Sequence, residues 1–205
     1  MTAPMIQLLV LDGQGVVFTD PFHDFLDRLA DATDQARATV RNRWANELRD
    51  RAWRGTINDN DLWHELSAGS GTEWDARLEA AYEAGPAAPH LRAWAAVVPI
   101  WLLTNHRTPW IERRIDRLDL RPWLSRVLVS DALGAVKPEP AVFAPILAHV
   151  TDPQSILLVD DQAKNVAAAA AAGMSSLLAD PAGTWLGAVH KRLPPGRLPQ
   201  SRSAH

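Results

Sequence analysis

Three carboxylates follow short apolar runs, and they are the residues of this chain best suited to chemistry. Asp12 follows the run Ile6 to Leu11, and the adjacent residues Asp160 and Asp161 follow the run Ile156 to Val159. If these runs are neighbouring strands, the carboxylates lie within about 5 Å, where each like-charge pair costs about 3 kcal/mol at an effective dielectric of about 20. A divalent cation relieves that repulsion, so the three residues predict a site for a hard cation.

A hydroxyl, an amide and an ammonium group occur at comparable places. Thr104 and Asn105 end the run Val97 to Leu103, and Lys137 lies in the loop that follows the run Val127 to Val129. Alone, each has an ordinary structural interpretation, because Thr-Asn caps helices and a loop lysine is usually solvated. Together they fall at strand ends, which is the edge where α/β sheets bind their ligands.

The apolar runs predict the elements that position these groups. They are continuous rather than alternating, which is typical of parallel strands covered on both faces. Helical patterns separate most of them, so crossover units and an α/β fold are expected. The expected strands are Ile6 to Leu11, Val97 to Leu103, Val127 to Val129, Ile156 to Val159 and Ser176 to Leu178, and the expected helices include Pro109 to Leu118, Pro140 to His149 and Val166 to Ala172.

The segment 21–85 breaks this rhythm, because it contains no convincing strand and its apolar residues recur at helical spacing. Turn-forming sequences bound it, Thr19 to Pro21 on one side and Gly85 to Pro89 on the other. We therefore expect a helical cap over 21–85, inserted into a core made of 1–20 and 86–192. Residues 193–205 are rich in Pro, Ser and Arg and predict a disordered tail. Four tryptophans of the insertion are expected to form its core: Trp44, Trp53, Trp63 and Trp74.

In this order, Asp12, Thr104, Lys137 and the pair Asp160-Asp161 resemble the four motifs of the haloacid dehalogenase (HAD) superfamily of hydrolases. The resemblance covers about Met5 to Leu178. It implies a Rossmann-like parallel sheet of about five strands with helices on both faces. The helical insertion resembles the small cap that many members carry between the first two motifs.

The resemblance also implies roles for the residues that match. Asp12 is the expected nucleophile. Thr104 is expected to bind the transferring group, and Lys137 to neutralise the negative charge of the nucleophile and of the phosphoryl group. Asp161 is expected to ligate Mg²⁺ with Asp160 in support. Asn165 falls where members often place a polar group behind the ligands. The full expected site has Asp12, Gln14, Thr104 and Lys137 as catalytic residues, Gly13, Thr104, Asn105 and Lys137 around the phosphate, and Asp12, Gln14, Asp160 and Asp161 around the metal.

Gln14 departs from the pattern, because phosphatases of this superfamily usually carry a second Asp two residues after the nucleophile. That Asp donates a proton to the leaving group, and an amide cannot. The loss is expected to cost about 10²–10⁴ in rate, or roughly 3–5 kcal/mol of barrier. Metal binding should survive, since members use the backbone carbonyl at this position. His23 or His106 could supply the missing proton.

Three functions remain open on these grounds. The first is a Mg²⁺-dependent phosphatase that acts on a small phosphorylated metabolite, preferably one whose leaving group needs little protonation. The second is a phospho-ligand binding protein with weak or no turnover. The third is a dehalogenase, which also lacks this Asp and needs no metal, although the pair Asp160-Asp161 argues against it. A phosphonate hydrolase with a cap lysine is excluded, because no lysine precedes Lys137.

Composition limits the partners and the chemistry that can be expected of this protein. The 205 residues are 47% hydrophobic with a formal net charge of -3, so we expect neither nucleic acid nor membrane partners. The absence of cysteine excludes thiolate chemistry and sulfur-ligated metals. No signal sequence is recognisable, which suggests a cytoplasmic location.

Cap residues should select the substrate, and the candidates, each weak alone, are Phe18, Asp20, His23, Trp53 and Arg54. The sequence pattern identifies neither the natural substrate nor the oligomeric state.

Overall fold

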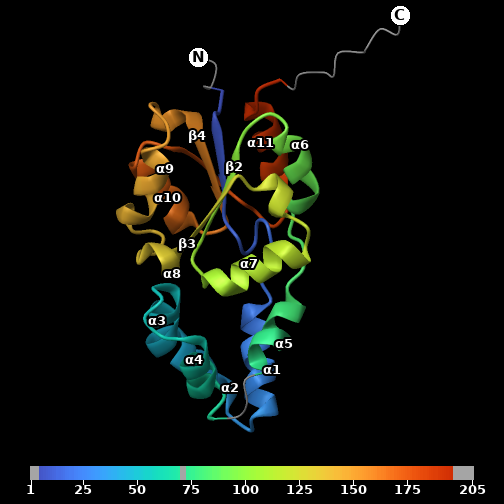
Figure 1. Ribbon diagram of the computed structural model, residues 1–205, viewed down its shortest axis with the longest axis vertical. Coiled ribbons are helices and arrows are strands. Elements are labelled where there is room, and N and C mark those ends of the chain that lie inside the picture. Colours follow the sequence, from blue (N-terminus) through green and yellow to red (C-terminus); the bar gives the residue numbers. More distant parts are fainter. Residues whose placement is uncertain (1–4, 70–72, 196–205) are drawn as a thin grey trace, which may run out of the picture.

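Five strands form one parallel sheet in the part of the chain that the computed structural model describes, residues 5–69 and 73–195 (Figure 1). The α/β fold expected from the sequence is therefore confirmed. The order is β3-β2-β1-β4-β5, which places β1 at the centre. The strands are β1 (Leu8–Leu11), β2 (Ile100–Thr104), β3 (Arg126–Val129), β4 (Ile156–Asp160) and β5 (Ser175–Leu178).

The register brings the expected polar groups to one edge of the sheet. On one side of β1, Leu11 pairs with Leu102 of β2, and on the other side it pairs with Val159 of β4. The side chains of β1, β2 and β4 are buried, as continuous apolar strands require. Asp12 and Asp160 therefore follow paired residues of neighbouring strands, and Thr104 ends the third.

Helices cover both faces of the sheet. The side chains of Leu9 and Leu11 share a hydrophobic cluster with α6 (Leu91–Ala95), α7 (Thr108–Arg117) and α11 (Thr184–Arg192). The opposite face, which includes Leu8 and Val10, packs with α9 (Ala144–Leu147), α10 (Ala163–Ala171) and the turn η4 (Pro140–Phe143). The shorter α8 (Ser130–Leu133) follows β3.

Several expected boundaries were wrong by a few residues. The strand expected from Val97 begins at Ile100, because the backbone N–H groups of Val97 and Val98 close a turn on Trp94. The single helix expected over Pro140 to His149 is a 3₁₀ turn, η4, followed by α9. Pro145 has no N–H group to donate to the preceding turn, which explains the division. Conversely, α10 begins at Ala163, three residues before the expected start.

The insertion between β1 and β2 is helical in all its described elements and lies beyond the carboxyl edge of the sheet (Figure 1). Trp44, Trp63 and Trp74 are buried, as expected for a helical core. Trp63 also stacks on Trp110 of α7 with ring centroids 5.2 Å apart, so the insertion and the sheet domain share one hydrophobic cluster. The elements are α1 (Phe22–Ala32), α2 (Arg37–Arg43), η1 (Trp44–Leu48), α3 (Arg49–Trp53), α4 (Asp59–Leu66) and α5 (Trp74–Ala81).

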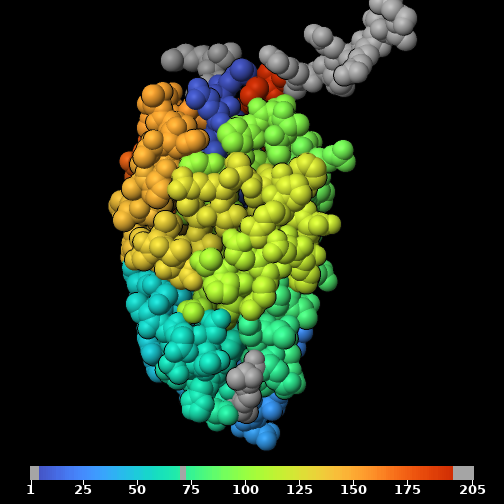
Figure 2. All heavy atoms as spheres, in the orientation of Figure 1, coloured from blue at the N-terminus to red at the C-terminus, as the bar shows by residue number. Residues whose placement is uncertain are grey.

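Arginines of α7 and of the loop before it fix the cap to the core. The space-filling view shows cap and core atoms meeting along a continuous boundary (Figure 2). Arg114 is fully buried, and its guanidinium lies 3.2 Å from the centre of the Tyr82 ring. The other ties are ion pairs, Arg107 with Asp59 at 2.5 Å, Arg113 with Asp75 at 2.7 Å, Arg114 with Glu79 at 3.0 Å and Arg117 with Glu79 at 3.1 Å.

Two expectations fall outside what the structure tests. The exact division of the chain into cap and core stays a prediction. Most of the expected tail lies outside the described residues, although Leu193, which is described, packs against the core. None of the described helices has the length and apolar character needed to cross a membrane.

Candidate active site

Lys137 joins two of the expected carboxylates. Its ammonium group lies 2.7 Å from Oδ1 of Asp12 and 2.6 Å from Oδ2 of Asp160, and it donates a third hydrogen bond to the backbone carbonyl of Leu103 at 3.0 Å. All three N–H donors of the ammonium group are therefore used by protein acceptors. Lys137 is placed to compensate charge on Asp12 and Asp160 at the sheet edge.

Burial and the neighbouring charges shift the pKa values of the groups in this cluster. Asp12 is 5% exposed, and desolvation raises the pKa of its carboxyl to about 8 despite the nearby Lys137 ammonium. Burial alone would lower the pKa of Lys137, but Asp12 and Asp160 outweigh it and raise that pKa overall. Burial, followed by the charge of Asp160, also raises the pKa of Asp161. The site therefore holds more negative charge than Lys137 alone can balance.

Asp160 and Asp161 are adjacent in sequence but differ in their surroundings. Oδ1 of Asp160 accepts hydrogen bonds from the backbone N–H of Gln162 and from Nδ2 of Asn165, both at 2.9 Å. Asp160 is thus completely held by the protein. The Asp161 carboxylate is exposed and accepts no hydrogen bond from any other residue that the structure describes.

This donor set fits a divalent cation. One ligand atom from each of Asp12, Asp160 and Asp161 lies within 4.8 Å of the others. Oδ1 of Asn165 is buried and has no hydrogen-bond partner among the described residues, although Asn165 lines the cavity. Hard cations bind such groups of carboxylate and amide oxygens. Asp12 and Asp161 are the residues whose carboxylates remain available to hold one.

Asn105 holds the loop that carries Lys137. Its Oδ1 accepts a hydrogen bond from the backbone N–H of Lys137 at 2.7 Å, and its Nδ2 donates to the backbone carbonyl of Lys137 at 2.9 Å. The amide that is expected at the phosphate therefore also fixes the backbone of the lysine. One N–H of Nδ2 remains for a ligand, and Asn105 does line the cavity.

Gln14 connects the loop that follows Asp12 to the helical insertion. Its Oε1 accepts a hydrogen bond from the Thr104 hydroxyl at 3.1 Å, and its Nε2 donates to the Tyr82 hydroxyl at 3.5 Å. Thr104 and Tyr82 are both fully buried. Gly13 is tightly enclosed, because a side chain there would meet the Thr104 hydroxyl at 2.6 Å. The loop therefore packs closely around Gln14.

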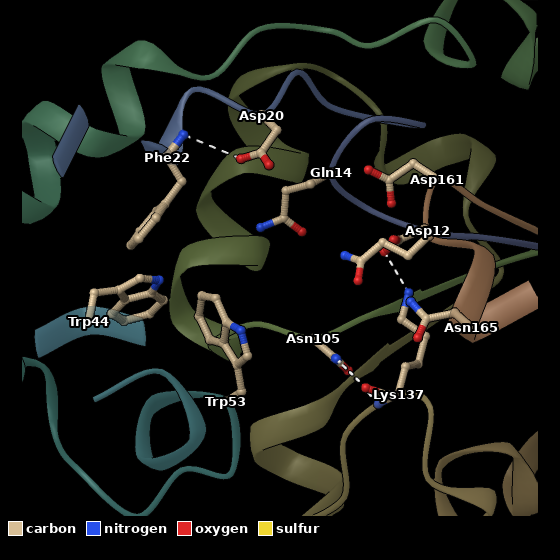
Figure 3. Close-up of a pocket in the computed structure, with 11 residues that line it drawn as sticks. Asp12, Gln14, Asp20, Phe22, Trp44, Trp53, Asn105, Lys137, Asp161 and Asn165 are labelled. Atoms are coloured by element: carbon tan, nitrogen blue, oxygen red, sulfur yellow. Dashed lines mark hydrogen bonds and ion pairs between the residues drawn. The ribbon is translucent and has the colours of Figure 1, made fainter. Parts of the chain in front are cut away.

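A cavity of about 160 Å³ opens beside these groups, between core and cap (Figure 3). The core contributes polar groups, which include the carboxylate of Asp20 just before the insertion, and the cap contributes aromatic rings. The arrangement places a buried carboxylate, an ammonium group and a cluster of carboxylates that could hold a metal ion around a space for a small molecule. The lining residues are Asp12, Gln14, Asp20, Phe22, Trp44, Trp53, Asn105, Lys137, Asp161, Gln162 and Asn165.

Comparison with known families agrees with this arrangement. The family model for haloacid dehalogenase-like hydrolases matches residues 14–173, most of the chain. The chain belongs to the haloacid dehalogenase-like hydrolases. No curated protein matches it significantly.

Solved structures of HAD proteins share the fold of this HAD-like hydrolase. A HAD family enzyme from Bacteroides thetaiotaomicron has a TM-score of 0.76 at 16% identity, covering 90% of this chain and 98% of that one. The same enzyme was also crystallised with magnesium and inorganic phosphate. A predicted HAD-like family hydrolase from Porphyromonas gingivalis has a TM-score of 0.72 at 20% identity, covering 91% and 97%. L-2-haloacid dehalogenase from Xanthobacter autotrophicus has a TM-score of 0.60 at 18% identity, covering 84% and 76%.

Of the residues expected to select the substrate of this HAD-like hydrolase, Trp53 and Asp20 line the cavity and three do not. Phe18 is fully buried beneath the Arg114 guanidinium, whose carbon lies 5.2 Å from the ring centre. His23 is exposed on α1 and is not part of the cavity wall. Arg54 is paired with Asp50 at 2.9 Å and with Glu139, so it ties the cap to the core.

The two histidines considered as proton donors, His23 and His106, also lie outside the cavity wall. His106 is completely buried, against the Trp53 ring at a centroid distance of 4.8 Å. Burial, helped by Arg114 and Arg107, lowers the pKa of His106 well below its usual value, so its ring is neutral near pH 7. Neither His106 nor His23 lines the cavity.

Sequence reasoning missed several groups that border the cavity. Trp44 was expected only in the cap core, yet it also faces the site, where it packs on Phe22 at a centroid distance of 4.6 Å. Gln162, which also lines the cavity, carried no signal beyond its type. Tyr82, the only tyrosine of the chain, is buried behind Gln14 and is not part of the cavity wall. A contact between Gln14 and a residue 68 positions away cannot be read from a local pattern.

Proposed function

We propose that this HAD-like hydrolase is a Mg²⁺-dependent phosphatase that acts on a small phosphorylated molecule through an aspartyl phosphate. The observation that carries the proposal is the geometry of Asp12, which is buried at the sheet edge 2.7 Å from Lys137 and beside Asp160 and Asp161. A nucleophilic carboxylate needs its negative charge compensated before it can approach a phosphate dianion. The cluster supplies both the nucleophile and that compensation.

In the first step, an oxygen of Asp12 attacks phosphorus, and the bond to the leaving oxygen breaks with its electrons on that oxygen. The Thr104 hydroxyl donates a hydrogen bond to the phosphoryl group in place of the one it gives Gln14. Water then attacks the phosphorus of the aspartyl phosphate, which releases inorganic phosphate and frees Asp12. Lys137 balances the negative charge of the Asp12 carboxylate before it attacks and again when water frees it from the phosphoryl group.

Mg²⁺ would be held by the carboxylates of Asp12 and Asp161 and by the backbone carbonyl of Gln14. Asp160 would orient the site through its hydrogen bonds to Gln162 and Asn165. When bound, the ion supplies positive charge that orients the phosphoryl group and balances it during transfer.

Proton transfer is the step in which this chain differs from the usual phosphatase pattern. Gln14 cannot donate a proton, and its amide is already engaged with Thr104 and Tyr82. Asp20 lines the same cavity as Gln14, and among the described residues its carboxylate accepts a hydrogen bond only from the backbone N–H of Phe22, at 3.3 Å (Figure 3). We propose that Asp20 serves as the proton carrier for this enzyme.

The relatives support phosphoryl chemistry over carbon chemistry. The Bacteroides enzyme binds magnesium and inorganic phosphate in its crystals, and the fold of this chain covers 93% of that structure. The Xanthobacter dehalogenase shares the fold as well. Asp160 and Asp161 favour the phosphatase, because two adjacent carboxylates beside Asp12 are costly in a site that uses no metal.

A phosphate-release screen tests the proposal. Aryl, acyl, sugar and nucleotide phosphates would be incubated with the protein in Mg²⁺ or in EDTA. We expect release from aryl or acyl phosphates that requires Mg²⁺ and disappears in Asp12→Asn. Turnover that persists in EDTA or in Asp12→Asn would overturn the mechanism. Mg²⁺-dependent binding of beryllium fluoride without any turnover would indicate a phospho-ligand binding protein instead.

A further inference from the structure

A second cavity of about 250 Å³ adjoins the active-site cavity on the side of α3. The two cavities share walls, because Trp53, Asn105, Lys137 and Gln162 line both. In Figure 3, Trp53, Asn105 and Lys137 border the same side of the active-site cavity. A substrate with its phosphate at Asp12 can therefore extend past these residues into the second cavity. The remaining lining residues of the second cavity are Arg49, Asp50, Val136 and Lys164.

Two cations of this second cavity have no partner among the described residues. Arg49 and Lys164 are exposed, and neither makes a hydrogen bond or an ion pair with the residues that the structure describes. The other arginines of this region are paired, since Arg51 contacts Glu65 at 3.2 Å and Arg54 contacts both Asp50 and Glu139.

The opposing charge of the second cavity is already balanced. Asp50 is the one acidic residue among the described residues that line it, and Oδ1 of Asp50 lies 2.9 Å from Nε of Arg54. Arg49 and Lys164 therefore leave the second cavity positively charged. The active-site cavity, by contrast, carries Asp12, Asp20 and Asp161. The second cavity therefore favours an anionic group at the end of the ligand that lies away from Asp12.

We propose that Arg49 and Lys164 form a subsite for a second anionic group of the substrate. On this inference, which rests on the proposed function, the substrate is a phosphate monoester whose other end bears a carboxylate or a second phosphate. The cap and the core each contribute one cation, from α3 and α10. The subsite therefore selects substrates by the charge and the length of their leaving group.

Binding of stable phosphonates tests the subsite without relying on turnover. The probes are 4-carboxyphenylphosphonate and 4-carbamoylphenylphosphonate, which match in shape and differ in the charge of one group, with their meta isomers. A phenylene bisphosphonate tests a second phosphate-like group. Calorimetry in Mg²⁺ would compare wild type, the double variant Arg49→Met with Lys164→Met, and the control Arg28→Met with Lys191→Met. The control removes two exposed cations that also lack partners among the described residues.

We expect wild type and the control to bind at least one carboxylate or bisphosphonate probe about tenfold more tightly than its carbamoyl counterpart, as two exposed ion pairs allow. The double variant should lose that preference and keep its affinity for the carbamoyl probes. Equal affinity for charged and neutral probes in wild type would overturn the subsite. So would a preference that survives in the double variant, or an equal loss of affinity for all probes, which would indicate general attraction of the phosphonate. If the preference is found but no ester is hydrolysed, the subsite stands and the proposed function fails.

Discussion

Replacing Gln14 by Asp is the substitution that bears most directly on the chemistry. Gln14 is half-buried between Thr104 and Tyr82 at the cavity wall. A carboxyl group at this partly desolvated position gains a raised pKa, so part of the population carries a proton near neutral pH. That proton can pass to a leaving oxygen, which the present amide cannot provide.

The magnitude depends on the leaving group. General acid catalysis contributes about 10²–10⁴ in rate, and the shorter side chain loses its hydrogen bond to Tyr82, so we expect the low end of that range. For alkyl phosphates, kcat should rise about 10²-fold, or roughly 3 kcal/mol of barrier. For 4-nitrophenyl phosphate, whose leaving oxygen needs little protonation, we expect a change of less than about threefold.

The assay is a series of phosphate monoesters that differ mainly in the pKa of the leaving alcohol or phenol. In wild type, log kcat should fall steeply as that pKa rises, and Gln14→Asp should flatten the slope. Gln14→Asn is the matched control, because it shortens the side chain equally without adding an acid. An equal gain for every ester, or the same flattening in Gln14→Asn, would refute the reasoning.

Three further predictions follow from the site and its surroundings. Asp20→Asn should lower kcat for alkyl phosphates about tenfold more than for aryl phosphates, and an equal effect on both classes would exclude Asp20 as a proton carrier. Mg²⁺ affinity should rise about tenfold per pH unit up to pH ~8 and then level off. The reason is that the raised pKa of Asp12 keeps its carboxyl protonated at lower pH, and a carboxyl must lose its proton to bind the ion. Calorimetry at several pH values checks this, and an affinity that does not change with pH contradicts it. Arg114→Met should lower the free energy of unfolding by about 3 kcal/mol, because it leaves the Glu79 carboxylate paired with Arg117 alone. Urea denaturation should show that adding Glu79→Gln to this variant recovers part of the lost free energy.

The sheet and its polar edge could be predicted because the signal is local. A strand buried on both faces must be continuously apolar, so the carboxylates that follow Leu11 and Val159 stand out. The parallel topology then brings Asp12, Thr104 and Asp160 together without any knowledge of side-chain contacts. Lys137 was found in the same way, from its place after β3.

The rest of the site could not be predicted because it depends on contacts between residues far apart in the sequence. The Asn105 amide also holds the backbone of Lys137, and only the folded loop reveals that match. Phe18 was a substrate candidate by position, yet it packs beneath Arg114. Trp44 begins the π-helical turn η1 between α2 and α3 and lines the cavity, and tryptophan spacing alone does not show which side of the helix faces the site.

The buried position of Arg114 has a consequence for how substrate range can change in this lineage. Its guanidinium depends on Glu79 and Tyr82, which lie at the end of the insertion, and it has no exposed surface through which water could replace them. A chimera that carried a foreign insertion would leave this cation without a counterion in the protein interior, at a cost of several kcal/mol. Single substitutions around the cavity rim leave that pairing intact. New specificities are therefore more accessible by point mutation than by exchange of the whole insertion.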